Sequence, residues 1–86
     1  MVRKYIVLDK AGLHARPASL LAQTASKYKN DILIGYKGKI MTLKSIMIVM
    51  SLGIPYKSSF TLEVKGEGET DILNELEQLL KDHNVI

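Results

Sequence analysis

The sequence predicts an α+β fold, a four-stranded antiparallel β-sheet with its helices packed on one face, in the element order βαββαβα. Segments with the period of a strand alternate with segments with the period of a helix. The 86 residues, of which 47% are hydrophobic, suffice for one folded domain with a modest core. The connections are short, which favours one sheet carrying its helices on one side. We therefore expect residues 1–86 to form a single domain, an open-faced β-sandwich.

The first half of the chain predicts a strand, a helix and a hairpin. Residues 3–8 are apolar and β-prone, and they end at a turn over residues 9–12. From residue 15 or 16 to residue 26 or 27, apolar side chains follow helical spacing. Pro17 belongs in the first turn of this helix, where its missing N–H costs nothing. A two-residue hairpin turn then joins two strands, predicted at residues 32–36 and 39–42.

The second half predicts a short helix, a strand and a longer helix. Residues 45–52 form the short helix, with Ser45 suited as N-cap and Gly53 as C-terminal stop. Residues 59–65 alternate apolar with polar side chains, as a strand with one buried face does. After a turn over residues 66–68 comes the last helix. Its apolar stripe consists of Ile72, Leu73, Leu76, Leu79 and Leu80.

Composition excludes several classes of site. The chain has no cysteine, so disulfides, thiolate metal sites and cysteine catalysis are excluded. His14 and His83 are its only histidines, which argues against a multi-histidine metal site, and we expect no cofactor. The first residues lack the apolar segment of a signal peptide. The longest apolar run, residues 46–50, is too short to span a bilayer. We therefore expect a cytoplasmic protein that does not insert into a membrane.

The net charge of +3 favours acidic partners or nucleic acid. However, the lysines are scattered along the chain, with no basic run interleaved with aromatic residues. We interpret most of them as ordinary solvated surface. A small nucleic-acid-binding module is an alternative function, and a steep salt dependence of binding would be its signature. The aromatic side chains form no motif that supports this alternative, so we expect no direct contact with nucleic acid.

The most chemically suggestive segment lies at the predicted start of the first helix and contains Gly12, His14, Arg16 and Pro17. A helix N-terminus offers unpaired N–H groups and the positive end of the dipole, which favour phosphate. His14 supplies a nucleophilic nitrogen at neutral pH, and Arg16 supplies a fork of donors. Gly12 permits a turn that other residues resist, and Pro17 fixes the backbone. These residues alone predict either an anion site with a nucleophile or a histidine that merely caps the helix.

Two segments resemble one known family. Residues 12–18 resemble the active-site motif of HPr, the phosphocarrier of the sugar phosphotransferase system. Residues 44–53 resemble the regulatory helix of HPr from low-GC Gram-positive bacteria, and the separation of the two segments also agrees. The resemblance implies that enzyme I phosphorylates His14 on its δ nitrogen, drawing on phosphoenolpyruvate. It further implies that Arg16 stabilises the phosphoryl group, that an EIIA domain receives it, and that the chain is a carrier rather than an enzyme.

Ser45 has two compatible roles. Its place before the short helix predicts an N-cap, worth about 1 kcal/mol. The resemblance implies that the HPr kinase/phosphorylase phosphorylates this serine and that the product binds a CcpA-type repressor, which makes the link to nucleic acid indirect. A phosphate is favourable at a helix N-terminus, and Lys44 is adjacent, so we expect the fold to persist after the modification.

The short helix is apolar around its whole circumference, and it cannot bury every side. We expect Val49 and Leu52 to face the core; the alternative is a helix buried more deeply. Exposed apolar clusters mark interfaces, and methionine suits surfaces that meet several partners. In the family, partners dock around this helix and the histidine. The residues predicted to dock partners are Leu20, Ile46, Met47 and Met50.

The sequence departs from the family pattern at two places that bear on partners and loops. Ile48 stands where the family usually has glycine or a polar residue, and it would enlarge the apolar patch. Residues 55–58 lack the glycine that the family often places before its last strand. Either another residue there adopts a left-handed turn at a cost, or the loop differs. A purely regulatory relative is a further alternative function; such relatives can lack the active-site histidine, whereas His14 is present.

Overall fold

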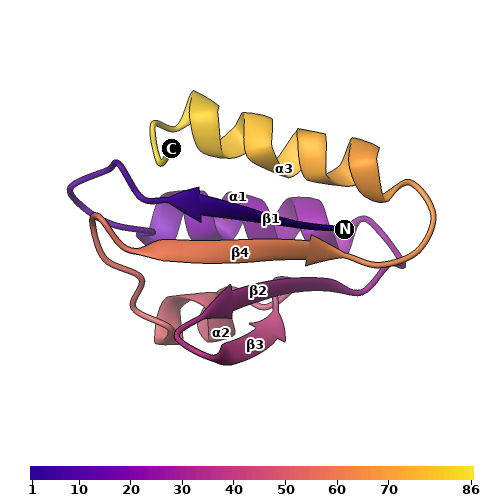
Figure 1. Ribbon diagram of the computed structural model, residues 1–86, viewed down its shortest axis with the longest axis horizontal. Helices are drawn as coiled ribbons and strands as arrows, with labels where there is room; N and C mark the ends of the chain where they lie inside the picture. Colours follow the sequence, from indigo (N-terminus) through magenta and orange to yellow (C-terminus); the bar gives the residue numbers. More distant parts are fainter.

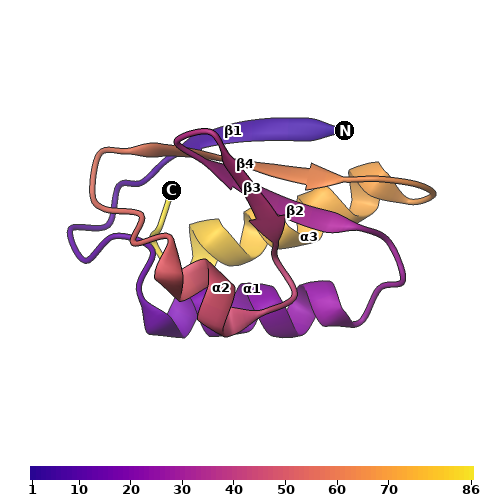
Figure 2. The ribbon, with the colours of Figure 1, turned by 90° about the horizontal axis from the view of Figure 1, so that it is seen from below.

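A four-stranded antiparallel sheet in the order β1-β4-β2-β3 forms one layer of the molecule, and three helices form the other (Figure 1). The computed structural model describes residues 1–86. The strands are β1 (Val2–Ile6), β2 (Ile32–Tyr36), β3 (Lys39–Thr42) and β4 (Ser59–Val64). The helices are α1 (Ala15–Ser26), α2 (Ile46–Ser51) and α3 (Glu69–Asp82). From the side, all helices lie on one face of the sheet and the other face is bare, as predicted (Figure 2).

The predicted and observed elements differ only at their ends. β2 and β3 have the predicted bounds, whereas β1 starts one residue earlier and stops two residues earlier than expected. It stops there because the Leu8 N–H donates to the carbonyl of Val85, at 2.6 Å, rather than to β4. β4 also ends one residue early. The N–H of the next residue, Lys65, donates to the carbonyl of Asp31 at 3.0 Å, a normal hydrogen-bond distance. Distant segments therefore set both ends.

The hydrophobic core lies between the sheet and the helices and contains no buried polar residue. On β4 the three alternating apolar side chains point inward as predicted, because Phe60, Leu62 and Val64 are all fully buried. Leu79, at the edge of the predicted stripe of α3, is only partly buried. The fully buried or nearly buried residues of α3 are Ile72, Leu73, Leu76 and Leu80, and those of α1 include Ala18, Leu21 and Ala25. The small side chains of α1 allow a close approach to the neighbouring helices α2 and α3.

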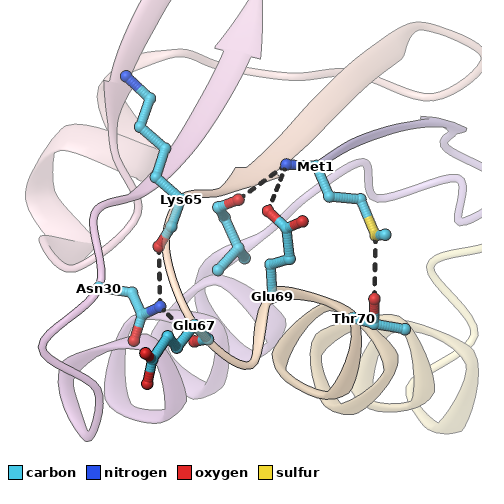
Figure 3. A network of polar contacts seen from close by, with 7 residues as sticks. Met1, Asn30, Lys65, Glu67, Glu69 and Thr70 are labelled. Carbon is cyan, nitrogen blue, oxygen red and sulfur yellow. Dashed lines mark hydrogen bonds and ion pairs between the residues drawn. The ribbon is translucent and has the colours of Figure 1, made fainter.

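Polar contacts close the end of the molecule at which β4 leads into α3. Figure 3 shows the amino group of Met1 donating to the carbonyl of Val64 and to Glu69 Oε2, both at 2.9 Å. Beside them, Asn30 Nδ2 donates to two carbonyls of the 65–67 turn, both at 2.8 Å. The loop that leads into α1 lies at the opposite end (Figure 1). One end is thus held by a network of hydrogen bonds, and the other carries the candidate site.

A second polar cluster fastens the edge strand β1 to α3. Arg3 Nη1 donates to Asn74 Oδ1 at 2.9 Å, and the Tyr5 hydroxyl donates to Glu77 Oε1 at 3.0 Å. Burial, followed by the hydrogen bond with Glu77, raises the pKa of Tyr5 to about 12. The same hydrogen bond lowers the pKa of Glu77. This cluster ties the edge strand to the helix layer by side chains as well as by packing.

Candidate functional site

His14 occupies the N-cap position of α1, but its side chain makes no capping hydrogen bond. Its backbone is extended, with φ −83° and ψ −178°, and its carbonyl accepts the Ala18 N–H at 3.1 Å. The first turn of α1 contains no acidic side chain. The helix itself therefore brings no negative charge to its N-terminal N–H groups and the positive end of its dipole, and these favour an anion beside the imidazole.

The two nitrogens of the His14 imidazole have different surroundings. The side chain as a whole is 43% exposed, yet Nδ1 is buried and has no hydrogen-bond partner. Nε2 lies 4.0 Å from Oδ2 of Asp9, whose side chain is 24% exposed. A buried polar atom without a partner is uncommon and requires an explanation. A bond formed at Nδ1 during function is one such explanation.

Gly12 positions the turn that delivers His14 to the helix. Its φ is +71°, in the left-handed region, and a Cβ atom there would lie 2.5 Å from the carbonyl oxygen of Ile54. The turn is further held by the Asp9 carbonyl, which accepts the Gly12 N–H at 2.9 Å, and by Asp9 Oδ1, which accepts the Ala11 N–H at 2.9 Å. The Leu13 N–H donates to the Ile54 carbonyl, also at 2.9 Å. Glycine is required at position 12 both for its φ and for space.

Pro17 and Arg16 lie in the first turn of α1. Pro17 is buried beneath the start of the helix, whereas Arg16 is exposed. The Arg16 side chain makes no hydrogen bond or ion pair, while Arg3 is engaged with Glu77. The structure therefore does not join Arg16 to His14 in a direct contact. It leaves the guanidinium two residues from the imidazole with all its donors available.

Loop 55–58 contains a left-handed residue, which is the first of the two alternatives that the missing glycine left open. Lys57 has φ +71°, which is strained for a residue with a side chain. Its N–H donates to the carbonyl of Val7 at 2.9 Å, and this bond ties the loop to the end of β1. The tertiary hydrogen bond offsets the local strain, so that the turn persists without glycine.

The short helix α2 is half embedded, and its exposed side is apolar. Val49 is buried and Leu52 packs against the core, as expected. Met47 is 81% exposed, and Ile48 is half-buried, so that it adds only part of its surface to the patch. The exposed members of the patch are Ile46, Met47 and Met50, with Leu20 partly exposed on α1. Their exposure agrees with the sequence; their role in docking stays a prediction.

Ser45 is the N-cap of α2, as predicted. Its Oγ accepts the Ile48 N–H at 3.3 Å, and its carbonyl accepts the Val49 N–H at 3.0 Å. Lys44 does not face this hydroxyl: its Nζ donates to the carbonyl of Tyr28 at 2.7 Å, near the C-terminus of α1. The adjacent lysine therefore serves the end of another helix in this structure.

Asp9 is the residue near the imidazole that the sequence did not single out. We expected only a turn at residues 9–12, and an aspartate in a turn is ordinary because its side chain caps local N–H groups. The only sequence signal was the position of its carboxylate, five residues before His14. This position indicates a contact with the imidazole only if the turn is known to bring the two side chains together. The structure contains no group of three or more His, Asp or Glu side chains placed to hold a metal ion. None of its helices is long and apolar enough to cross a bilayer.

Comparison with known proteins identifies relatives over nearly the whole chain. The family model described as "PTS HPr component phosphorylation site" matches residues 1–82. The histidine-containing phosphocarrier protein of a mycoplasma is 37% identical, with a TM-score of 0.95 over 100% of this chain and 98% of that one. The phosphocarrier protein HPr of Bacillus anthracis is 37% identical, with a TM-score of 0.82 over 92% and 94% of the two chains. The catabolite repression protein Crh of Bacillus subtilis, described as a domain-swapped dimer, is 36% identical, with a TM-score of 0.72 over 93% and 92%.

Proposed function

We propose that Nδ1 of His14 is the atom that carries the phosphoryl group. The chain belongs to the HPr family and so has the general role of a phosphocarrier in the phosphotransferase system. Under this proposal enzyme I donates the group and an EIIA domain receives it. The observation that carries the proposal is the buried Nδ1 without a partner, at the N-terminus of a helix whose first turn contains no acidic side chain.

The chemistry requires little from the chain itself. The Nδ1 lone pair of His14 attacks phosphorus, the bond between phosphorus and the donor breaks, and the electron pair leaves with the donor. The half-exposed ring has to swing slightly to present Nδ1, and side chains of this exposure move on the picosecond to nanosecond timescale. The first-turn N–H groups of α1 and the free guanidinium of Arg16 then face the phosphoryl oxygens.

The carrier role, as opposed to an enzyme with its own turnover, is part of the same proposal. His14 is on an open surface, because neither of the two surface hollows of the molecule includes it. A large partner with its own active site fits such a surface better than a small substrate does. We propose that the chain, as one HPr-like domain in the cytoplasm, supplies the phosphoryl acceptor and alignment, while its partners supply the rest.

The exposed side of α2 is the proposed docking surface for these partners. The hydrogen bond between Leu13 and Ile54 joins the His14 turn to the segment that follows α2. The start of α1 and the helix α2 lie at the same end of the molecule (Figure 2). A partner that covers Met47 and Met50 is placed to align a reacting group with His14.

We propose a regulatory role for Ser45 as well, through phosphorylation by an HPr kinase/phosphorylase and binding of the product to a CcpA-type repressor. A similar protein, Crh, is described by its part in catabolite repression, which supports a regulatory function in this fold. The Ser45 hydroxyl already lies at the N-terminus of α2, where a phosphate interacts favourably with the helix dipole. The free N–H groups of that helix, rather than Lys44, are the expected partners of the phosphate.

The proposed carrier role is tested by incubating the purified protein with enzyme I and phosphoenolpyruvate. We expect one acid-labile phosphate per chain, lost in His14→Ala and retained in His83→Ala. His83 is the matched control because it is the other histidine, and it caps the C-terminus of α3 rather than the N-terminus of a helix. No phosphate on the wild type, with an enzyme I that charges a standard HPr, would refute the proposal and favour a regulatory role.

A further inference from the structure

We propose that Asp9 is a positioning residue for the phosphoryl acceptor: its carboxylate keeps the imidazole proton on Nε2 of His14, so that the lone pair stays on Nδ1. The inference rests on the proposed function of His14 and adds to it the group that selects the reacting nitrogen. It starts from one distance, the 4.0 Å between Asp9 Oδ2 and His14 Nε2.

The Asp9 carboxylate is held in place before any phosphate arrives. Its Oδ1 accepts the Ala11 N–H at 2.9 Å, and its carbonyl accepts the Gly12 N–H at the same distance. The two carboxylate oxygens therefore have separate tasks: Oδ1 holds the turn and Oδ2 faces the imidazole. Because the turn has already restricted this side chain, little further conformational entropy is lost when Oδ2 pairs with His14.

The surroundings of the ring favour one assignment of the proton. A neutral imidazole carries hydrogen on one nitrogen and a lone pair on the other. Nδ1 of His14 has no hydrogen-bond partner, whereas the group nearest Nε2 is a carboxylate, which only accepts. A proton on Nε2 is attracted by Asp9, and a lone pair there would be repelled. The separation of 4.0 Å is longer than a hydrogen bond, but such contacts tighten when the reacting complex forms.

The same contact acts in both transfer steps. When the Nδ1–P bond forms, the electron pair of the broken bond leaves with the donor and the Nε2 proton stays, so the ring becomes positively charged beside Asp9. When the phosphoryl group moves on, the Nδ1–P bond breaks and its electron pair returns to Nδ1. Because Nε2 still holds its proton, the leaving group is a neutral imidazole of His14. Loss of that proton would require an imidazolate to leave, which is far less favourable.

The carboxylate also repels the incoming phosphoryl oxygens, and this effect has the opposite sign. The cation of Arg16 and the N–H groups at the start of α1 oppose the repulsion, and the first turn of the helix adds no further negative charge. We therefore expect the net effect of Asp9 to be favourable and modest. The pair is partly exposed, which limits the effect on the transfer rate to about fivefold.

Two substitutions separate the charge of Asp9 from its role in the turn. In Asp9→Asn the side-chain oxygen still accepts the Ala11 N–H, whereas Asp9→Ala removes both the charge and this bond. Asp31→Asn is the matched control, since Asp31 is exposed, lies beyond the other end of α1, and its side chain makes no hydrogen bond or ion pair. The amide spectrum of each variant shows whether it is folded, and Asp9→Asn keeps the proposal testable if Asp9→Ala is not.

The first readout is the tautomer of His14, measured from the ¹⁵N shifts of its ring nitrogens at a pH where the imidazole is neutral. We expect the Nε2–H form in the wild type and in Asp31→Asn, and a clear gain of the Nδ1–H form in Asp9→Asn. The second readout is phosphorylation by enzyme I. We expect kcat to fall about fivefold in Asp9→Asn with KM unchanged, because the partly exposed pair orients the acceptor rather than binding the partner.

An unchanged tautomer in Asp9→Asn, or an unchanged or faster transfer, would overturn the role of Asp9. Neither result would contradict the proposed function, because His14 would still be phosphorylated. Conversely, a wild type that enzyme I cannot phosphorylate would remove the proposed function, while the tautomer measurement would still report on the Asp9–His14 contact. The two failures are therefore distinguishable.

Discussion

The carbonyl of Ile54 accepts the N–H of Leu13 at 2.9 Å, and it lies 2.5 Å from the position that a Cβ atom of residue 12 would take. This one oxygen joins the turn before α1 to the segment after α2. It explains why the histidine and the exposed side of α2 share one end of the molecule, and it makes position 12 intolerant of any side chain.

Gly12→Ala is therefore expected to reduce both stability and phosphorylation. The left-handed φ and the contact with Ile54 together predict a loss of about 2–3 kcal/mol, because strain and steric displacement add. Gly53→Ala is the matched control: its φ is +60°, but nothing lies within 4 Å of its Cβ position, so about 1 kcal/mol is expected. Urea unfolding measures both. Equal losses in the two variants would contradict the steric argument.

Arg16→Ala is expected to slow phosphoryl transfer without unfolding the protein. Its side chain makes no contact in the free protein, so the free energy of unfolding should change by no more than about 0.5 kcal/mol. Transfer should slow by about tenfold or more, because a charge-assisted bond to the phosphoryl group is lost. Arg16→Lys should recover part of the rate, since lysine keeps the charge but not the fork. Lys29→Ala, which removes an exposed cation after α1, should leave the rate unchanged.

Met47→Glu tests the docking surface. Met47 is 81% exposed, so the substitution should hardly change stability, yet a charge in the apolar patch should raise the KM for enzyme I about tenfold. Ile40→Glu is the control, because Ile40 is also largely exposed but lies on β3, at the edge of the sheet. If the two variants raise KM equally, the patch on α2 is not the docking surface.

Ser45→Ala should cost about 1 kcal/mol of stability, because the Ile48 N–H loses its cap. Ser51→Ala removes a second serine hydroxyl, which belongs to the last residue of α2 and donates to the Ile48 carbonyl, and it should cost less. Incubation with an HPr kinase and magnesium-ATP should label the wild type and Ser51→Ala but not Ser45→Ala. Labelling that survives in Ser45→Ala would place the modification elsewhere.

The contact between Tyr5 and Glu77 predicts how stability depends on pH at both extremes. Burial and this contact raise the pKa of Tyr5 from 10.0 to about 12. Its stabilising effect is thus present below pH 10 and is lost as the pH rises toward 12. The hydrogen bond from Tyr5 lowers the pKa of Glu77 below 4.5, so its contribution is present above pH 4.5 and is lost as the pH falls through the lower folded value.

Tyr5→Phe should remove the alkaline loss that belongs to Tyr5 and weaken the acidic one. Urea unfolding from pH 3 to pH 12 measures both. The pKa of Tyr28 is raised too, by its hydrogen bond with Glu75, so the difference between wild type and Tyr5→Phe isolates Tyr5. Parallel pH profiles for the two proteins would show that the contact with Glu77 does not contribute.

Much of the fold could be predicted because the evidence was local. The alternation of side chains in β4 and the stripe of α3 report which face of each element is buried, wherever that element packs. The half-exposed state of α2 followed from six residues that are nearly all apolar on a helix too short to bury every side. The position of His14 before Pro17 likewise predicted a place at a helix N-terminus.

The sequence by itself therefore determined the element order, the buried faces of β4 and α3, the N-cap of α2, and the residues that could carry phosphate. Only the tertiary structure decided that Leu8 pairs with Val85, that Lys44 binds the end of α1, and that Asp9 faces the imidazole. The reason is physical: periodicity reports the local backbone, whereas these contacts depend on how a turn folds back and which distant segment packs beside it.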